Sequence, residues 1–250
     1  MRIPRIHTDE ALSTAAELTL AGNAAHHAGR VLRMKAGRHL ILCNGDGRDY
    51  RAEILESGGR SLRVRILDAT NPGTESTLDI TLGQVMSRGE RMDYAIQKAT
   101  ELGVTRIQPL TSERCEVRLS GERKRKRVNN WQQMVISAAE QCGRARFPNV
   151  ATPLKLDDWL SGCDHDLQLV LHEQGQPFSG TGAAPGSIAL LVGPEGGLNE
   201  REVELARGAG FQPLVLGPRT LRTETATVTV LSLCQWIWGD FQSPDRASGA

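Results

Sequence analysis

Apolar and polar residues alternate in three short segments near the amino end of the chain. The segments are residues 39–43, 50–55 and 61–67. In the third, Leu62, Val64 and Ile66 are separated by arginines, and a period of two residues is typical of strands that bury one face. Glycine-rich turns separate the segments. The pattern predicts a small β-barrel, although an unrelated strand-rich domain would show the same alternation.

Beyond residue 78, strand-like segments alternate with segments of helical period. Strands are predicted at 78–86, 106–110, 167–171, 188–192 and 214–216. Apolar stripes of helical spacing occupy residues 92–102, which end at a glycine, and residues 131–138. Another helix is predicted after Asn199, which can form a capping box with Glu202. The alternation predicts β-α-β units.

The last long segment carries two conflicting signals. Threonines alternate from Thr223 to Thr229 as in a strand, whereas apolar residues recur at helical spacing from Ala226 to Ile237. The helical stretch is too long for an ordinary strand, so we predict a helix. Three segments are predicted to lack regular structure, namely a linker at 68–77, a loop at 174–187 and a disordered tail at 243–250.

Composition and cysteine usage narrow the class of protein. Hydrophobic residues make up 39% of the 250 residues, enough for a globular core. The net charge is +1, so any contact with nucleic acid has to come from local clusters of charge. The five cysteines form no C-x-x-C pair, and no segment has the apolar run of a signal peptide or a membrane span. We therefore expect a cytoplasmic protein with reduced thiols, no membrane segment and no metal.

Two apolar strands run into similar glycine-proline turns. The strand at 188–192 leads into Gly193-Pro-Glu-Gly-Gly197, and the strand at 214–216 leads into Gly217-Pro-Arg-Thr-Leu. In an open α/β sheet the loops beyond the carboxyl ends of parallel strands line the ligand crevice, and glycine lets a ligand approach the backbone closely. The two loops therefore predict one shared pocket. The alternative is that both are ordinary turns between a strand and a helix.

Two common nucleotide-binding classes lack their signatures in this chain. A Rossmann fold would carry a G-x-G-x-x-G-like loop after its first strand, where this chain has Ser87-Arg-Gly-Glu90. Neither glycine turn ends in the G-K-[ST] of a P-loop. The sequence therefore offers no site for nucleotide hydrolysis.

Several motifs together resemble one enzyme family. They are residues 1–6, 27–33, 83–90, 97–104, 139–144, 193–197 and 216–225. These motifs, in this order along nearly the whole chain, resemble those of the SPOUT methyltransferases. Within that superfamily they are similar to the RsmE family, which methylates N3 of a uridine in 16S ribosomal RNA. The resemblance implies an α/β fold, with a PUA-like or OB-like RNA-binding β-barrel at residues 1–71. A SPOUT-type parallel sheet with a carboxyl-terminal trefoil knot is implied for residues 74–242.

The resemblance also implies a homodimer with the cofactor site near the interface. Trp236, Ile237 and Trp238 are candidate apolar contacts for it. A buried helix face would explain these residues equally well.

S-adenosyl-L-methionine is the cofactor that the resemblance implies for the shared pocket, without metal. The candidate cofactor-binding residues are Leu171, His172, Val192, Gly193, Glu195, Gly196, Leu216, Gly217, Leu221, Arg222, Thr223 and Thr225. The strand ends would surround the adenine, and backbone groups with the hydroxyl of Thr223 or Thr225 would close the other side. The candidate catalytic residues are Arg222 and Glu224. Arg222 would stabilise negative charge on the uracil carbonyls, while Glu224 would accept the N3 proton or merely form an ion pair with Arg222.

RNA contacts are expected from clustered basic residues. The candidates are Arg2, Arg5, Arg30, Arg33, Arg88 and Arg144. The implied partner is 16S ribosomal RNA within the assembled small ribosomal subunit. The basic run at 122–127 is either a further RNA contact or a solvated helix face. Two alternatives stay open, a SPOUT enzyme for ribose 2′-O or transfer RNA methylation and a non-catalytic ribosome-assembly factor.

Overall fold

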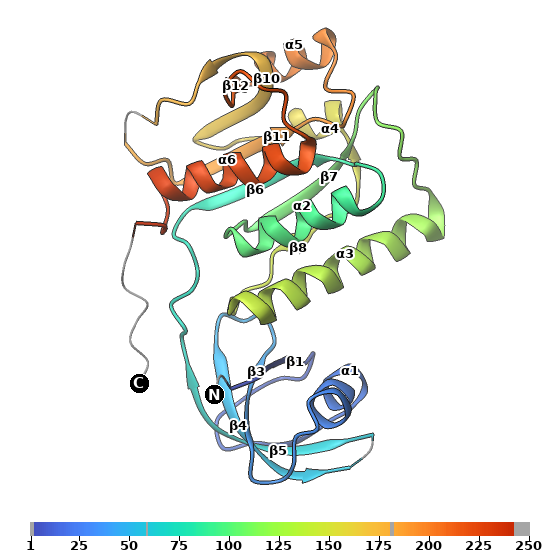
Figure 1. The fold of residues 1–250 in the computed structure, drawn as a ribbon, viewed down its shortest axis with the longest axis vertical. Helices are drawn as coiled ribbons and strands as arrows, with labels where there is room; N and C mark the ends of the chain where they lie inside the picture. The colour runs from blue at the N-terminus through green and yellow to red at the C-terminus, as the bar shows by residue number, and fades with distance from the viewer. Residues whose placement is uncertain (1–2, 59, 181–182, 243–250) are drawn as a thin grey trace. The chain divides into compact units, whose positions relative to one another are not determined.

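The computed structural model of the protein describes residues 3–58, 60–180 and 183–242. Contacts divide these residues into two compact units (Figure 1). The first contains the described residues up to Glu75 together with Ala139–Phe147, and the second contains the rest up to residue 242. Arg2 and the tail predicted at 243–250 lie outside the described residues. The amino-terminal unit thus includes Ala139–Phe147, a segment that the sequence placed in the domain at residues 74–242.

The first unit is built on one five-stranded sheet. Its strands are β1 (Arg5–His7), β2 (Glu17–Leu20), β3 (His39–Cys43), β4 (Asp49–Ser57) and β5 (Leu62–Thr70), in the order β1-β3-β4-β5-β2. A short helix α1 (Gly22–Ala25) and a π-helical turn η1 (His26–Val31) follow β2. Leu62, Val64 and Ile66 are at most 1% exposed, whereas Arg63 and Arg65 pair with Glu17 on the opposite face. The apolar residues of the alternating pattern therefore face the core, and the polar residues between them face solvent.

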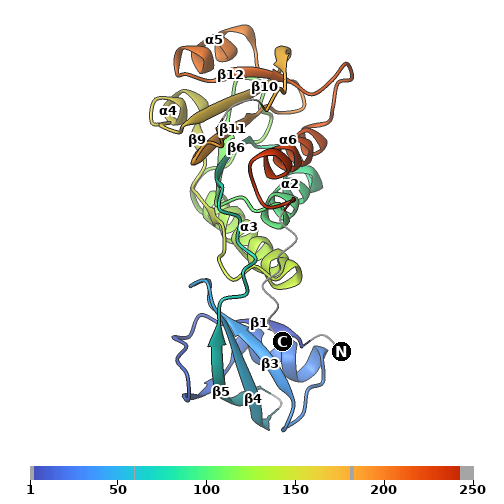
Figure 2. The ribbon, with the colours of Figure 1, turned by 90° about the vertical axis from the view of Figure 1, so that its left-hand side faces the viewer.

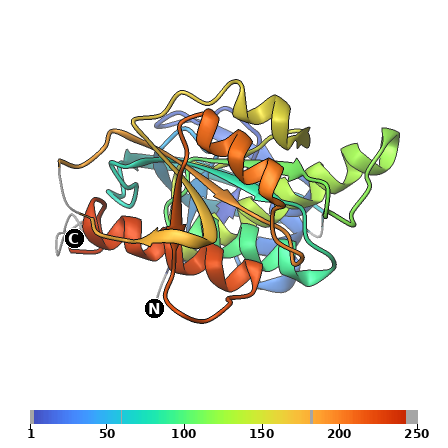
Figure 3. The same ribbon diagram turned by 90° about the horizontal axis from the view of Figure 1, so that it is seen from above.

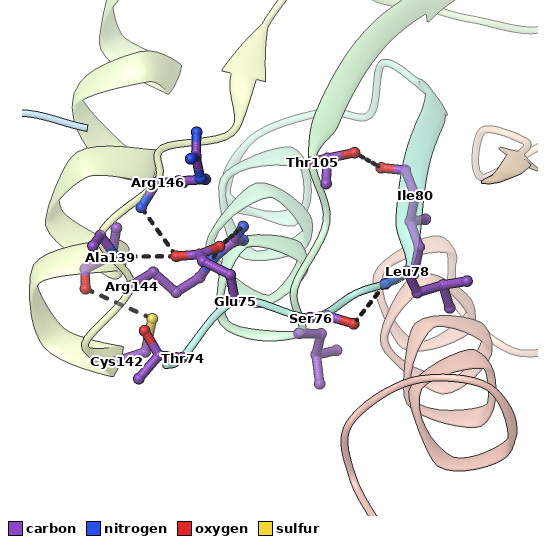
Figure 4. Close-up of polar contacts among 12 residues, drawn as sticks. Thr74, Glu75, Ser76, Leu78, Ile80, Thr105, Ala139, Cys142, Arg144 and Arg146 are labelled. Atoms are coloured by element: carbon purple, nitrogen blue, oxygen red, sulfur yellow. Dashed lines mark hydrogen bonds and ion pairs between the residues drawn. The ribbon is translucent and has the colours of Figure 1, made fainter. Parts of the chain in front are cut away.

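Glu75 fastens the segment Ala139–Phe147 to the first unit (Figure 4). Its Oε2 accepts hydrogen bonds from Nε and Nη2 of Arg144, at 3.0 and 2.8 Å. Its Oε1 accepts from the backbone N–H groups of Ala145 and Arg146, both at 3.0 Å. One carboxylate therefore satisfies a guanidinium and two backbone donors, which is a strong, charge-assisted arrangement.

Two of the arginines predicted to contact RNA are interior residues of this unit. Arg144 has only 6% of its side chain exposed and pairs with Glu75. Arg5 is 8% exposed, forms an ion pair with Asp49 and donates to the carbonyl oxygen of Arg144. Their charge is used inside the protein, so the structure does not place Arg5 and Arg144 on a surface that RNA could reach.

The second unit is a parallel sheet with helices on both faces. Its strands are β6 (Asp79–Val85), β7 (Arg106–Thr111), β8 (Asn149–Val150), β9 (Leu154–Lys155), β10 (Leu167–Pro177), β11 (Ser187–Val192) and β12 (Gln212–Val215). The order is β12-β10-β11-β6-β7-β8, with β9 also on β7, and every pairing is parallel. The helices are α2 (Glu90–Glu101), α3 (Gly121–Cys142, of which Ala139–Cys142 belong to the first unit), α4 (Leu156–Leu160), α5 (Glu200–Gly208) and α6 (Thr223–Ile237). Figure 2 and Figure 3 show α4 and α5 on one face and α2 and α6 on the other.

Strand β10 continues further than the sequence predicted. The expected loop at 174–187 is wrong for its first residues, because β10 reaches Pro177. The strand shifts register against β12 so that both Leu171 and Gln176 pair with Leu214. A Cβ atom on Gly175 would lie 2.5 Å from the backbone of Leu214. Glycine here allows a bulge with close backbone approach, and does not mark a loop.

The helix predicted for the last segment is confirmed as α6. Val230, Leu231 and Cys234 are fully buried along its inner face. The hydroxyls of Thr227 and Thr229 lie 2.9 and 2.8 Å from the carbonyl oxygens four residues earlier. Threonines can therefore occupy a helix here because their hydroxyls find partners within it. Across the described ranges, no helix is both long enough and apolar enough to cross a membrane.

We predict that replacing Glu75 by Gln destabilises the protein by about 3 kcal/mol, because it leaves the buried Arg144 without its carboxylate. Urea unfolding followed by circular dichroism measures the loss. The control is Asp68→Asn, since Asp68 and its partner Arg51 are 43% and 45% exposed and such a pair contributes less than about 1 kcal/mol. Equal losses in the two variants would contradict a structural role for the Glu75 contacts.

Candidate functional site

A cavity of about 980 Å³ lies where β10, β11 and β12 end. The loops after β11 and β12 and the first turn of α6 form its walls. Of the predicted cofactor-binding residues, all except Thr225 line it. The carboxyl ends of parallel strands share one edge of a sheet, which is why loops from separate strands meet here. The two glycine turns therefore form one pocket, as the sequence predicted.

The turn after β11 is held by the start of α5. Gly197 has a φ of +69° and its N–H donates to the carbonyl of Pro194. Asn199 then caps α5, because its side chain accepts from the N–H of Glu202 at 2.8 Å and the Glu202 carboxylate accepts from the N–H of Asn199 at 3.0 Å. This is the capping box expected from the sequence. Glu202 is 2% exposed and also accepts from the N–H of Glu113, which ties the loop after β7 to the same place.

The turn after β12 depends on the backbone conformation of one glycine. Gly217 has a φ of +81°, and a Cβ placed on it would meet nothing within 4 Å. Glycine is therefore required by the left-handed backbone and not by crowding within the protein. Gly193, in contrast, is packed, since its Cβ would lie 3.3 Å from Leu198.

The hydroxyl of Thr223 is used inside the protein. It donates to the carbonyl of Gly193 at 2.8 Å and accepts from the side-chain amide of Gln84 at 3.0 Å. Its single proton is thus committed, so it has no donor left for a ligand. Thr223 lines the cavity, but in this structure its hydroxyl joins two walls of the cavity to one another.

Ion pairs organise one side of the cavity rim. The carboxylate of Glu195 accepts from Arg91 at 2.9 Å and from the backbone N–H of Arg88 at 3.1 Å. Partial burial opposes ionisation of Glu195, but its own backbone N–H, that of Arg88 and the Arg91 guanidinium outweigh burial and lower its pKa. The exposed guanidinium of Arg88 pairs with Glu116 at 2.5 Å. The predicted RNA-contact residue Arg88 is therefore close to the rim, although it does not line the cavity.

The two candidate catalytic residues lie side by side at the start of α6. Arg222 is the exposed residue that precedes the helix, and Glu224 lies in the first turn. Both line the cavity, but no ion pair joins Arg222 to Glu224 among the described residues. Oε2 of Glu224 is buried and has no hydrogen-bond partner there. A carboxylate on a cavity wall that forms no ion pair is suited to a positive charge or a donated proton.

The remaining predicted RNA contacts lie in the first unit. Arg30 belongs to η1 and Arg33 follows it, and both are exposed. Arg33 has a φ of +50°. These two residues therefore remain available as RNA contacts, unlike Arg5 and Arg144.

The cysteines are buried or partly buried, and none lines the cavity. Burial raises the pKa of Cys43 and Cys234 to about 12 and that of Cys163 to about 11. Cys115 is 1% exposed, and its thiol lies 3.4 Å from the carbonyl of Met86. The structure thus places no activated thiolate at the site. Within the described ranges, no three His, Cys, Asp or Glu side chains are grouped to hold a metal ion.

Comparisons with known proteins agree with this architecture. A family model described as an RNA methyltransferase domain matches residues 74–235, and one described as an RNA methyltransferase PUA domain matches residues 20–67. The ribosomal RNA small subunit methyltransferase E of Buchnera aphidicola is 35% identical over 96% of this chain and 98% of its own. That of Bacillus subtilis is 30% identical over 90% and 92%.

Solved structures show the same likeness. A ribosomal RNA small subunit methyltransferase E from Neisseria gonorrhoeae bound to S-adenosyl methionine is 38% identical, with a TM-score of 0.90 over 96% of this chain and 100% of that one. A putative methyltransferase from Legionella pneumophila in complex with the same cofactor is 40% identical, with a TM-score of 0.92 and the same coverage. These matches confirm the α/β methyltransferase fold preceded by a PUA domain. The chain belongs to the ribosomal RNA small subunit methyltransferase E family, the RsmE family of RNA methyltransferases.

Proposed function

We propose that the protein uses S-adenosyl-L-methionine to methylate N3 of a uridine in 16S ribosomal RNA. The observation that carries the proposal is the cavity at the carboxyl edge of the sheet, which Arg222 and Glu224 line together with two glycine loops. The similar structures from Neisseria gonorrhoeae and Legionella pneumophila hold this cofactor. Family membership supports an RNA substrate in the small ribosomal subunit.

The residues that line the cavity suit the cofactor chemically. Its apolar wall is formed by Leu171, Val192, Leu198, Leu214, Leu216 and Leu221. Such a wall suits the flat adenine, and the backbone of the two glycine loops can recognise its polar edge. Glu195 is neutralised by Arg91, so the carboxylate of Glu224 is the group on this cavity that complements the positive charge of the cofactor.

Methylation at N3 requires removal of one proton and control of the resulting charge. The bound cofactor supplies an electrophilic methyl group, so no covalent enzyme intermediate is needed. We assign the role of accepting the N3 proton to the carboxylate of Glu224, a residue that lines the cavity. The Arg222 guanidinium then stabilises the negative charge on the uracil carbonyls. Methylation at C5 would instead need a thiolate, and no cysteine lines the cavity.

The proposal includes the expected partners of the enzyme. The RNA would be bound within the assembled small subunit, in the cytoplasm, by a homodimer. Trp236 supports a protein contact at the end of α6, since it is 56% exposed. Ile237 and Trp238 are partly buried. Threading of the two glycine loops into a trefoil knot belongs to the same proposal.

We predict that Gly217→Val weakens cofactor binding at least about tenfold, because a β-branched side chain resists positive φ and would enter the space that the ligand needs. Isothermal calorimetry with S-adenosylmethionine measures the affinity. Gly37→Val is a matched control, since Gly37 also has a φ of +81° with open space around it and lies in the first unit. Gly37→Val should cost similar stability and leave the affinity unchanged. Normal affinity in Gly217→Val would place the cofactor elsewhere.

The exposed arginines of the first unit should contribute RNA affinity and not catalysis. Converting Arg30 and Arg33 to Glu is expected to weaken RNA binding and to lower the slope of log affinity against log salt by about 1 for each phosphate that is no longer neutralised. Filter binding at several salt concentrations measures this slope. Arg60→Glu, a change at another exposed arginine of the unit, serves as the control. An unchanged slope would assign Arg30 and Arg33 to ordinary surface charge.

Turnover should depend on Arg222 and not on the thiols of Cys115 and Cys142, neither of which lines the cavity. Arg222→Ala is expected to lower kcat about a hundredfold, as when one stabilising donor is removed, while much of the cofactor affinity remains. Cys115→Ala and Cys142→Ala should stay active. Nucleoside analysis of the RNA product should find 3-methyluridine. A folded cysteine variant that binds both substrates but has no activity would overturn the N3 assignment, as would a ribose-methylated product.

A further inference from the structure

A fully buried glutamine lies behind the cavity and is not one of the predicted binding or catalytic residues. Gln84 is near the end of β6 and is 0% exposed. Its Nε2 donates to the carbonyl of Val85 at 3.1 Å and to Oγ1 of Thr223 at 3.0 Å. Its Oε1 lies 2.6 Å from the hydroxyl of Thr227. Both donors of the amide therefore have partners, and its acceptor competes with the carbonyl oxygen of Thr223 for the single proton of Thr227.

These contacts connect two walls of the cavity. The hydroxyl of Thr223 donates a hydrogen bond to the carbonyl oxygen of Gly193 at 2.8 Å. Gly193 begins the loop after β11, and Thr223 is the first residue of α6, between Arg222 and Glu224. The amide N–H of Gln84 occupies one lone pair of the Thr223 oxygen. The hydroxyl hydrogen of Thr223 therefore points away from Gln84, toward the carbonyl of Gly193. A single side chain of β6 thus contacts α6 at two residues, one of which is bonded to the β11 loop.

We propose that Gln84 is a positioning residue for methyl transfer, an inference that rests on the proposed function of the cavity. Gln84 holds Thr223 and Thr227, and through Thr223 it holds Gly193. This places Arg222 and Glu224 at the cavity wall. Because Gln84 does not line the cavity, it acts through Thr223 and touches neither cofactor nor RNA.

The structure offers a matched control on the other end of α6. Gln235 is also 0% exposed, and its amide donates to the carbonyl of Leu102 at 3.0 Å and accepts from the hydroxyl of Ser76 at 2.9 Å. It therefore has the same burial and the same kind of partners as Gln84. Gln235 does not line the cavity, and neither do its partners. A purely structural role would make the two glutamines equivalent.

The experiment compares Gln84→Met with Gln235→Met in the full chain, by thermal unfolding, calorimetry with S-adenosylmethionine and steady-state kinetics on ribosomal RNA. Both variants should lower Tm. Only Gln84→Met should weaken cofactor binding, about tenfold for the removal of one buried hydrogen bond, and lower kcat. Normal affinity and kcat in Gln84→Met, or equal losses in both variants, would overturn the inference.

Two further variants keep the test decisive if Gln84→Met does not fold. Thr227→Val removes the hydroxyl that contacts Gln84 and should show a milder form of the same loss, while Thr227→Ser should restore normal values. Failure of Thr227→Ser to restore them would count against the inference. Wild-type protein that bound no cofactor would overturn the proposed function itself, and the inference with it.

Gln84→Glu adds a test by pH. An ionised carboxylate there can only accept hydrogen bonds, so it would repel the carbonyl of Val85 and could not donate to Thr223. Burial raises the pKa of such a carboxyl, and its protonated form regains one donor. Cofactor affinity of this variant should therefore recover as pH is lowered, relative to wild type. An affinity ratio that did not change with pH would contradict the proposed donation to Thr223.

Discussion

The parallel direction of every strand in the second unit is the constraint on which its site depends. Hydrogen bonding between β6, β11, β10 and β12 brings their carboxyl ends to one edge. The loops that follow β11 and β12 must then emerge together, although about twenty residues of chain separate them. The chain after β12 also starts α6 at this edge, and this is why Thr223 meets Gly193. The strand order and direction therefore determine where the cavity forms, and the side chains determine what lines it.

Charged residues of one type serve opposite purposes in this protein. Arg5 and Arg144 are interior groups whose carboxylate partners Asp49 and Glu75 neutralise them. Arg222 is exposed on the cavity. An overall charge of +1 conceals this division. The arginines whose guanidinium groups are exposed to solvent, and not the total number of arginines, determine where a polyanion can bind.

The sequence predicted features that depend on neighbours in the chain. The capping box of Asn199 and Glu202 spans three residues, and the strand His39–Cys43 follows from local alternation. Features that depend on distant partners were missed. The bulge at Gly175 exists because of Leu214, and the π-helical turn after β2 has no simple periodic signature.

The candidate site also combines features that depend on neighbours in the chain with features that depend on distant residues. Its glycine turns could be found from the sequence, because each is a short motif after an apolar strand. The occupation of the Thr223 hydroxyl could not, since Gln84 lies 139 positions away. Likewise the burial of Arg144 is set by Glu75, which lies 69 positions earlier. Residue type identified the groups capable of chemistry, and only the fold decided which of them are free for it.

The contacts of Glu75 also bear on how the chain is made. A nascent chain leaves the ribosome from its amino end, so the sheet of the first unit is synthesised well before its partners in Ala139–Phe147. Until those residues emerge, Glu75 lacks its partners Arg144 and Ala145, and Arg5 lacks the carbonyl of Arg144. The amino-terminal unit therefore completes its fold after much of the second unit has been translated. A fragment that ended at the apparent domain boundary would remain in that unfinished state.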